Sequence, residues 1–330
     1  MINFQYLRAS SPKSAIDGVR TDLSAQFIAG GTNLIDLMKR GITAPPKLVD
    51  INNLPLRDIA DEGKTIRIGA LALNSTVADH SLILKKLPLL AQALNAGASA
   101  QIRNMATVGG NMMQRTRCPY FYDPSLPCNK RAPGSGCGAV AGINRMHAIF
   151  GLEPVPDQHV CIAVHPSDMC VALAALDATV EVWGPGGNRT IPFTGFHRLP
   201  GSNPQKDNTL QHGELITALR LPDNALATHS HYLKIRDRAS YAFALISVAA
   251  ALDLKGKTIQ QARLAMGGVA HKPWRLTEAE QVLIGKPATE ATFREAAQVA
   301  MRGARAFEHN TYKLKLAPAA IVEALTRAAG

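Results

Sequence analysis

The chain has 330 residues, which is long for a single hydrophobic core and typical of two or three subdomains. Hydrophobic residues make up 46% of the sequence, and no apolar run reaches the roughly 18 residues that would span a bilayer. The net charge of +11 could suit nucleic acid, but the basic residues are dispersed, aromatic residues make up only 5%, and no groove-binding motif occurs. These features argue against a membrane span and a nucleic-acid-binding domain, whereas anionic cofactors and acidic partner surfaces account for the charge.

The first pattern along the chain is a strand, a glycine turn and a helix within residues 24–41. An apolar strand is predicted at 26–29, a turn at 30–33, and a helix at 34–40. Backbone N–H groups in such a turn are unsatisfied donors at the positive end of a helix, so they suit a phosphate. The motif is not the GxGxxG of a Rossmann unit, and a Gly-Gly pair also occurs in turns that bind nothing.

Short strands and helices alternate through the rest of the chain, in an order that is α+β and not regularly doubly wound. Two polar stretches predict a loop at 203–213 and a domain boundary at 223–231. Beyond the boundary we expect a compact α+β unit that ends in two or three helices. The predicted strands lie at 47–51, 65–69, 179–183, 190–193, 214–221, 232–236 and 261–266, with an apolar stretch at 242–254 and one helix over 84–97.

Four of the five cysteines lie in a loop segment between Thr107 and Asp168. The segment is rich in Gly and Pro and directly follows a second glycine turn, Thr-Val-Gly-Gly-Asn at 107–111. Such loops are not locked into helix or strand, so they allow four thiolates to converge on an iron–sulfur cluster. The four cysteines, separated by nine, eight and 23 residues, are Cys118, Cys128, Cys137 and Cys161.

The cysteine spacing alone matches neither the compact ferredoxin run nor the paired pattern of zinc ribbons. Charge favours a cluster, because six basic residues and one acid, Asp123, lie between Arg103 and His147, and basic neighbours stabilise an anionic centre. Three interpretations stay open on these residues alone: an iron–sulfur cluster, a zinc site, and free or disulfide-bonded cysteines. Cys170 lies in an apolar helical stretch at 168–176 and is predicted to be a buried structural thiol.

Several separated motifs resemble the FAD-binding medium subunits of molybdenum hydroxylases, the flavoproteins of the xanthine dehydrogenase and carbon monoxide dehydrogenase types. These motifs lie at 29–34, 107–111, 234–244 and 267–275, so the resemblance covers nearly the whole chain. The cysteine segment is similar to the FAD and [4Fe–4S] subunits of bacterial periplasmic aldehyde oxidoreductases. The blocks that carry this closer resemblance lie at 117–122, 128–131, 136–138, 144–147 and 161–168.

The resemblance implies an α+β fold with a two-subdomain FAD-binding domain of the PCMH/VAO type, followed by an α+β domain of the CO dehydrogenase flavoprotein type. The FAD-binding domain would span 1–225 and the C-terminal domain 226–330. Within the first domain, we expect one subdomain at about 1–55, a second at about 56–225, and a [4Fe–4S] insertion at about 112–164.

The resemblance also implies a set of cofactor-binding residues. Two glycine turns would wrap the pyrophosphate and ribityl chain of FAD, and Asp168, Ile216 and Lys234 match positions near the flavin. A cation at Lys234 would stabilise the anionic reduced ring; the alternative is a solvated surface lysine. The first turn comprises Gln26, Phe27, Ile28, Ala29, Gly30, Gly31, Thr32, Asn33 and Leu34, the second Thr107, Gly109, Gly110 and Asn111, and the cluster ligands would be Cys118, Cys128, Cys137 and Cys161.

The implied function is that of an electron-transfer subunit containing FAD and a [4Fe–4S] cluster in a heterotrimeric molybdenum-dependent aldehyde oxidoreductase. A large partner with the molybdenum cofactor would oxidise the aldehyde, and a small partner with [2Fe–2S] clusters would relay electrons. The FAD of this chain would pass them to an external acceptor. Two alternatives are a self-sufficient NAD(P)H-dependent flavin reductase of similar fold and a non-catalytic module that holds zinc.

Two further expectations concern the histidines and the location. His147, His165 and His271 are predicted to be hydrogen-bonded scaffold residues, since no nucleophile or HExxH signature includes them. The first ten residues lack the regions of a signal peptide, so no export signal is expected. The resemblance nevertheless implies a periplasmic location through co-export with a signal-bearing small partner, and a cytoplasmic location is the alternative.

Overall fold

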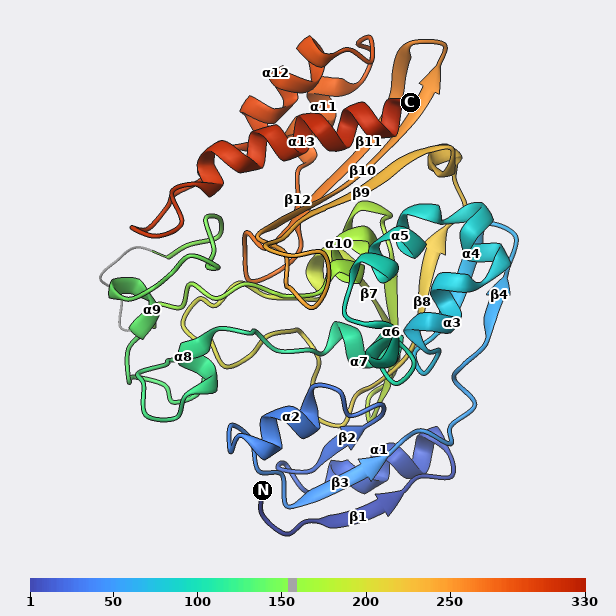
Figure 1. Ribbon diagram of the computed structural model, residues 1–330. Coiled ribbons are helices and arrows are strands. Elements are labelled where there is room, and N and C mark those ends of the chain that lie inside the picture. The colour runs from blue at the N-terminus through green and yellow to red at the C-terminus, as the bar shows by residue number, and fades with distance from the viewer. Residues whose placement is uncertain (154–158) are drawn as a thin grey trace.

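Three β-sheets, each with its own helices, make up the computed structural model, which describes residues 1–153 and 159–330. Figure 1 shows the N-terminal sheet at the bottom, a central five-stranded sheet with its helices in the middle, and the C-terminal sheet and helices at the top. The insertion predicted at 112–164 therefore includes five residues, 154–158, that lie outside the described part.

The N-terminal sheet is parallel, with the order β1-β3-β2. Parallel strands need crossover connections: α2 connects the neighbours β2 and β3, and α1 connects the two outer strands β1 and β2. The helix α1 shows how the sequence specifies these connections. That helix begins with a capping box between Ser11 and Ser14, with Pro12 at its first position, and it buries Ile16 and Val19. The elements are β1 (Gln5–Arg8), α1 (Pro12–Arg20), β2 (Gln26–Ile28), α2 (Leu34–Lys39) and β3 (Lys47–Asp50).

The central sheet is antiparallel, with the order β4-β5-β8-β6-β7. Alternate residues such as Ile66 and Ile68 point into the core beneath the helices. The single helix predicted over 84–97 is wrong: the structure has two helices, because Leu87 precedes Pro88 and leaves the helical region. The elements are β4 (Ile59–Asp61), β5 (Thr65–Gly69), α3 (Asn74–Asp79), α4 (Ser81–Lys86), α5 (Pro88–Ala96), α6 (Ala100–Arg103), α7 (Val108–Met112), α10 (Asp168–Ala175), β6 (Thr179–Gly184), β7 (Gly187–Pro192) and β8 (Leu215–Pro222).

The cysteine segment runs between α7 and α10, and its described part holds only two short helices, α8 (Pro119–Tyr122) and α9 (Gly138–Ala141). It lies at one side of the molecule, between the N-terminal sheet and the C-terminal domain (Figure 1). Arg117 pairs with Asp36 of α2 at 3.3 Å, and Asn144 accepts a hydrogen bond from the backbone of His309 at 2.9 Å. The segment is therefore attached to both ends of the chain.

The C-terminal sheet is antiparallel, with the order β12-β11-β10-β9. Residues 246–252 of β10 are all buried because α13 covers one face and α10 packs on the strand as well, which explains the unbroken apolar pattern there. The boundary predicted at 223–231 extends too far, since β9 already begins at His229. The elements are β9 (His229–Ile235), β10 (Ile246–Lys255), β11 (Thr258–Gly267), β12 (Trp274–Arg275), α11 (Thr277–Leu283), α12 (Glu290–Ala300) and α13 (Lys313–Ala329).

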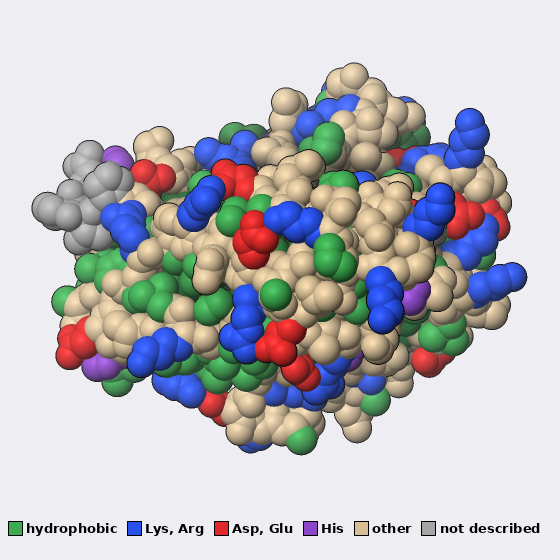
Figure 2. Space-filling view, turned by 90° about the horizontal axis from the view of Figure 1, so that it is seen from above, with side chains coloured by type: hydrophobic (Ala, Val, Ile, Leu, Met, Phe, Trp, Pro, Cys, Tyr) green, Lys and Arg blue, Asp and Glu red, His purple; other side chains and the backbone are tan. Residues whose placement is uncertain are grey.

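The surface carries its positive charge in dispersed form. Figure 2 shows Lys and Arg side chains interspersed with acidic ones and not gathered into one basic stripe. Several of them pair along a helix, such as Arg294 with Glu290 and Arg327 with Glu323. Among the described residues, no helix is both long and apolar enough to cross a membrane.

Candidate functional site

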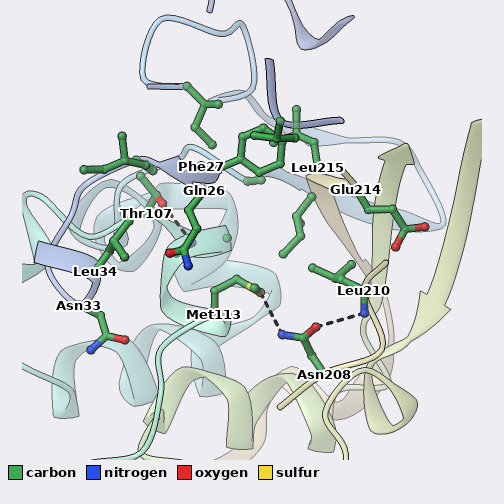
Figure 3. A pocket seen from close by; sticks show the side chains of 18 of the residues that line it. Gln26, Phe27, Asn33, Leu34, Thr107, Met113, Asn208, Leu210, Glu214 and Leu215 are labelled. Atoms are coloured by element: carbon green, nitrogen blue, oxygen red, sulfur yellow. Dashed lines mark hydrogen bonds between the residues drawn. The ribbon is translucent and has the colours of Figure 1, made fainter. Parts of the chain in front are cut away.

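A large cavity of about 500 Å³ lies between the N-terminal sheet and the central sheet. Its walls come from β2 and the turn that follows it, from the start of α7, and from the loop that leads into β8. Figure 3 shows these side chains, among them Gln26, Thr107, Met113 and Leu215. The cavity has the size of a cofactor site and is bordered by both predicted glycine turns.

The two glycine turns pack directly against each other. A Cβ added at Gly30 would lie only 1.8 Å from the backbone oxygen of Met105, so no other residue fits there. Gly31 has a φ of +70°, which side-chain-bearing residues rarely adopt. In the second turn, the Thr107 hydroxyl caps α7 by accepting from the Gly110 N–H at 3.1 Å.

Most of the predicted FAD-contacting residues line this cavity: all nine residues at 26–34, together with Thr107, Gly109, Gly110 and Ile216. Asn111 does not line the cavity. Its side-chain oxygen instead accepts hydrogen bonds from the Ser167 hydroxyl and from the Gln114 side chain. Asp168 and Lys234 also lie outside it. The structure thus gathers the two turns at one cavity and separates three predicted residues from it.

Asp168 and Lys234 form a buried ion pair with a nitrogen–oxygen distance of 2.7 Å. The Tyr232 hydroxyl donates to the other carboxylate oxygen at 2.8 Å, and the Lys234 ammonium also donates to the Ala96 carbonyl. The Lys234 side chain is only 5% exposed, so the alternative of a solvated surface lysine is wrong. Asp168 lines a second cavity, of about 120 Å³.

Replacing Asp168 with Asn is expected to destabilise the protein, because it leaves the Lys234 charge buried without a counterion. Breaking a buried pair from one side costs about 3–5 kcal/mol. The measurement is the free energy of unfolding by urea, followed by circular dichroism. The exposed pair of Asp17 with Lys13 is the matched control, and Asp17→Asn should change stability by less than about 1 kcal/mol. Equal stability of the Asp168→Asn variant and the wild type would contradict the assigned role of this pair.

Asp207 connects the large cavity to the cysteine segment, and the sequence analysis missed it. Its carboxylate lines the cavity and pairs with Arg115 at 2.7 Å and with the buried Lys130. Burial opposes ionisation of Asp207, but Lys130 and Arg115 outweigh that effect and lower its pKa to about 2. One feature of the sequence could have pointed to Asp207: the cysteine segment has an excess of basic residues. These residues require acidic counterions from other parts of the chain.

The four cysteines Cys118, Cys128, Cys137 and Cys161 line one small cavity and form no disulfide. Burial raises the pKa of the Cys118 and Cys161 thiols to about 12. Nearby backbone N–H groups act in the opposite direction and lower these pKa values: those of Tyr120 and Phe121 at Cys118, that of Ala163 at Cys161, and those of Ala139, Val140 and Ile162 at Cys137. Such N–H donors are typical around metal-bound cysteines.

His147 contacts the cysteine group through its ring. Its Nε2 lies 3.1 Å from the Cys118 sulfur, and its backbone carbonyl accepts from the buried ammonium of Lys313 at 2.8 Å. Burial lowers the pKa of His147 to about 4, so the ring is neutral at pH 7. The prediction of hydrogen-bonded scaffold histidines is wrong for His271, whose two ring nitrogens have no partner among the described residues.

Comparison with known families places the whole chain in one class. Residues 2–224 match the family described as FAD binding domain in molybdopterin dehydrogenase, and residues 231–328 match the CO dehydrogenase flavoprotein C-terminal domain. The chain belongs to the FAD-binding medium subunits of the molybdenum hydroxylases and is therefore a subunit of an oxidoreductase. The family and the α+β fold class predicted from the sequence are confirmed.

Individual relatives cover nearly the full length of the chain. It is 45% identical to the aldehyde oxidoreductase FAD-binding subunit PaoB of Escherichia coli strain K12. This match extends over 329 residues and covers 98% of each of the two chains. It is 27% identical to the carbon monoxide dehydrogenase medium chain of Hydrogenophaga pseudoflava, over 88% of this chain and 84% of that one. The solved structure of carbon monoxide dehydrogenase from the same organism superposes with a TM-score of 0.77 at 26% identity, covering 99% of this chain and 98% of that one.

Proposed function

We propose that the chain binds FAD in the large cavity and transfers electrons within an aldehyde-oxidising molybdenum enzyme. The observation that carries this proposal is the convergence of both glycine turns on one cavity of cofactor size in a chain of the FAD-binding family. The 45% identity to an aldehyde oxidoreductase subunit supports aldehydes as the substrate class. FAD supplies the redox chemistry, while the turns bind its phosphates and the cavity walls orient it.

The same proposal includes a [4Fe–4S] cluster bound by Cys118, Cys128, Cys137 and Cys161. The four residues line one cavity, backbone N–H groups near three of the sulfurs favour the thiolate form, and the buried Lys130 favours it at Cys161. All of these features suit thiolates bound to an anionic cluster.

Zinc is the alternative occupant of the same four cysteines. Four ligands of a structural zinc site surround one ion, whereas in a [4Fe–4S] cluster each thiolate binds a different iron. Elemental analysis of the purified chain distinguishes the two, because a cluster contributes about four irons and a zinc site none.

His147 gives this proposal a spectroscopic test. Its Nδ1 has no partner and its Nε2 lies 3.1 Å from the Cys118 sulfur, so a neutral ring would donate its one proton to that sulfur. A hydrogen bond that stabilises the reduced cluster by about 1 kcal/mol more than the oxidised cluster raises the one-electron potential by about 40 mV. We expect His147→Phe to lower the midpoint potential by about that amount in an EPR redox titration. His80→Phe, at a histidine outside the cysteine segment, is the control, and an unchanged potential in His147→Phe would contradict this role.

The partners and the location are two further parts of the proposal. We infer a large subunit with the molybdenum cofactor and a small subunit with [2Fe–2S] clusters, because the relatives are medium chains of larger enzymes. A periplasmic location through co-export remains part of the proposal, and cell fractionation of the native host tests it. Recovery of the chain in the cytoplasm alone would contradict it.

Flavin reduction distinguishes the proposed function from a self-sufficient reductase. The purified chain should keep its oxidised flavin spectrum when NADH or NADPH is added anaerobically. In the complex purified from its host, an aldehyde should bleach the flavin within a few turnovers. Rapid bleaching of the isolated chain by NAD(P)H would instead identify a reductase that needs no partner.

A further inference from the structure

Four buried histidines have ring nitrogens without a hydrogen-bond partner. In the described part of the chain, eight buried side-chain nitrogen or oxygen atoms have no partner, and five of them belong to His147, His165, His197 and His271. A buried polar group that nothing satisfies destabilises the folded protein. A concentration of them in one region points to a bound water or a bound ion.

Two of these histidines converge with a cysteine that is separate from the four in the cysteine segment. One donor atom each of His165, Cys170 and His197 lies within 4.8 Å of the other two. The residues come from the loop before α10, from the first turn of α10, and from the loop after the 3₁₀ turn Phe193–Gly195. All three are buried, with exposures of 8%, 0% and 4%.

The ring of His197 is oriented as a metal ligand would be. Its Nε2 lies 2.9 Å from the Met112 carbonyl, to which it donates its proton, so the partnerless Nδ1 carries a lone pair. Metal-bound histidines usually donate their other ring N–H to a carbonyl or carboxylate in this way. The His165 ring lies alongside, with its centroid 4.2 Å from that of His197, and its Nε2 also lacks a partner.

We propose that His165, Cys170 and His197 bind one thiophilic metal ion of the zinc class, at a site that shares no ligand with the four cysteines of the cluster. Imidazole and thiolate are the ligands that Zn²⁺ and Cu⁺ prefer, and three protein ligands leave a fourth position for water. Of the three residues, His165 also lines the second cavity.

Binding of the ion is balanced as a proton exchange. The metal–sulfur bond replaces the S–H bond of Cys170, one proton is released, and the thiolate offsets one charge of the ion.

Elemental analysis of the purified holoprotein tests the site. We expect about one zinc or copper per chain beside the iron, and the element detected identifies the ion. Cys170→Ala should lose the zinc or copper and keep the iron. Cys128→Ser should lose the iron and keep the zinc or copper. A wild-type protein that contains neither zinc nor copper, or a zinc content that survives Cys170→Ala but not Cys128→Ser, would overturn the proposal.

Cobalt provides a second readout that does not depend on the folding of Cys170→Ala. Co²⁺ added to the Cys128→Ser protein, whose visible spectrum is free of the cluster, should give the charge-transfer and d–d bands of a thiolate-bound tetrahedral ion. A further His197→Gln substitution should abolish these bands. No cobalt bands in the Cys128→Ser protein would contradict the site, and bands unchanged by His197→Gln would exclude this histidine as a ligand.

Discussion

The Cys128→Ser variant is expected to lose its iron and the broad visible absorbance of the cluster while it keeps its FAD. Cys128 is buried, and it pairs with Cys137 through a backbone bridge at the centre of the cysteine segment. A serine hydroxyl is a poor ligand for iron at neutral pH, and a cluster that lacks one of four thiolates is labile. Met113 and Arg115 of this segment line the FAD cavity, but none of the four cysteines does, so flavin binding should persist.

Iron, sulfide and flavin assays on the variant, together with limited proteolysis, give the measurement. Iron should fall from about four atoms per chain to near zero, and cleavage between Arg115 and Cys161 should become faster because the segment loses its cross-link. Cys170→Ala is the matched control: it removes a buried thiol outside the segment and should leave the iron unchanged. Unchanged iron in Cys128→Ser would contradict the ligand assignment.

The Gly110→Val variant is expected to lose at least about tenfold in FAD affinity, equivalent to about 1.4 kcal/mol. Gly110 lines the large cavity, and a Cβ there meets only the Thr107 hydroxyl, at 3.0 Å. The protein can therefore tolerate the new side chain, which then occupies the space where the backbone would approach a phosphate. Gly30 is less suitable for this test, since any side chain there collides with the Met105 backbone and disrupts the fold itself.

Flavin occupancy after gel filtration, followed by titration of the apoprotein with FAD, measures this effect. Gly186→Val in the β6–β7 hairpin is the control, because a Cβ at that position meets nothing within 4 Å and Gly186 lies outside the cavity. Circular dichroism should show that both variants are folded. Full FAD occupancy of Gly110→Val would mean that the second glycine turn does not contact the cofactor.

Local sequence signals predicted much of the fold. The Gly30-Gly31 turn, its preceding strand and its following helix are found where the pattern indicated, because positive φ and tight packing can be met only by glycine. The helix break at Pro88 also has a local sequence signal. The prediction gave more weight to the helical spacing of apolar residues on both sides of that proline. The early start of β9 at His229 depends on pairing with β10, which the polar local sequence does not reveal.

Long-range contacts account for what the sequence could not predict at the site. The Lys130–Asp207 pair joins residues 77 positions apart, and nothing in the polar loop around Asp207 marked it as a partner. The burial of Lys234 against Asp168 likewise depends on the pairing of β9 with β10, on which α10 packs. The histidines lacked any motif, so their convergence with Cys170 emerges only from the folded chain.

An anaerobic visible spectrum of the purified chain, with iron, sulfide and flavin quantitation, tests the central claim most directly. The claim is that one polypeptide holds both FAD and a [4Fe–4S] cluster. We predict about one FAD, about four irons and about four sulfides per chain, with flavin bands superimposed on a broad absorbance that dithionite bleaches. Flavin without iron or sulfide would contradict the cluster assignment and leave the four cysteines with a structural role.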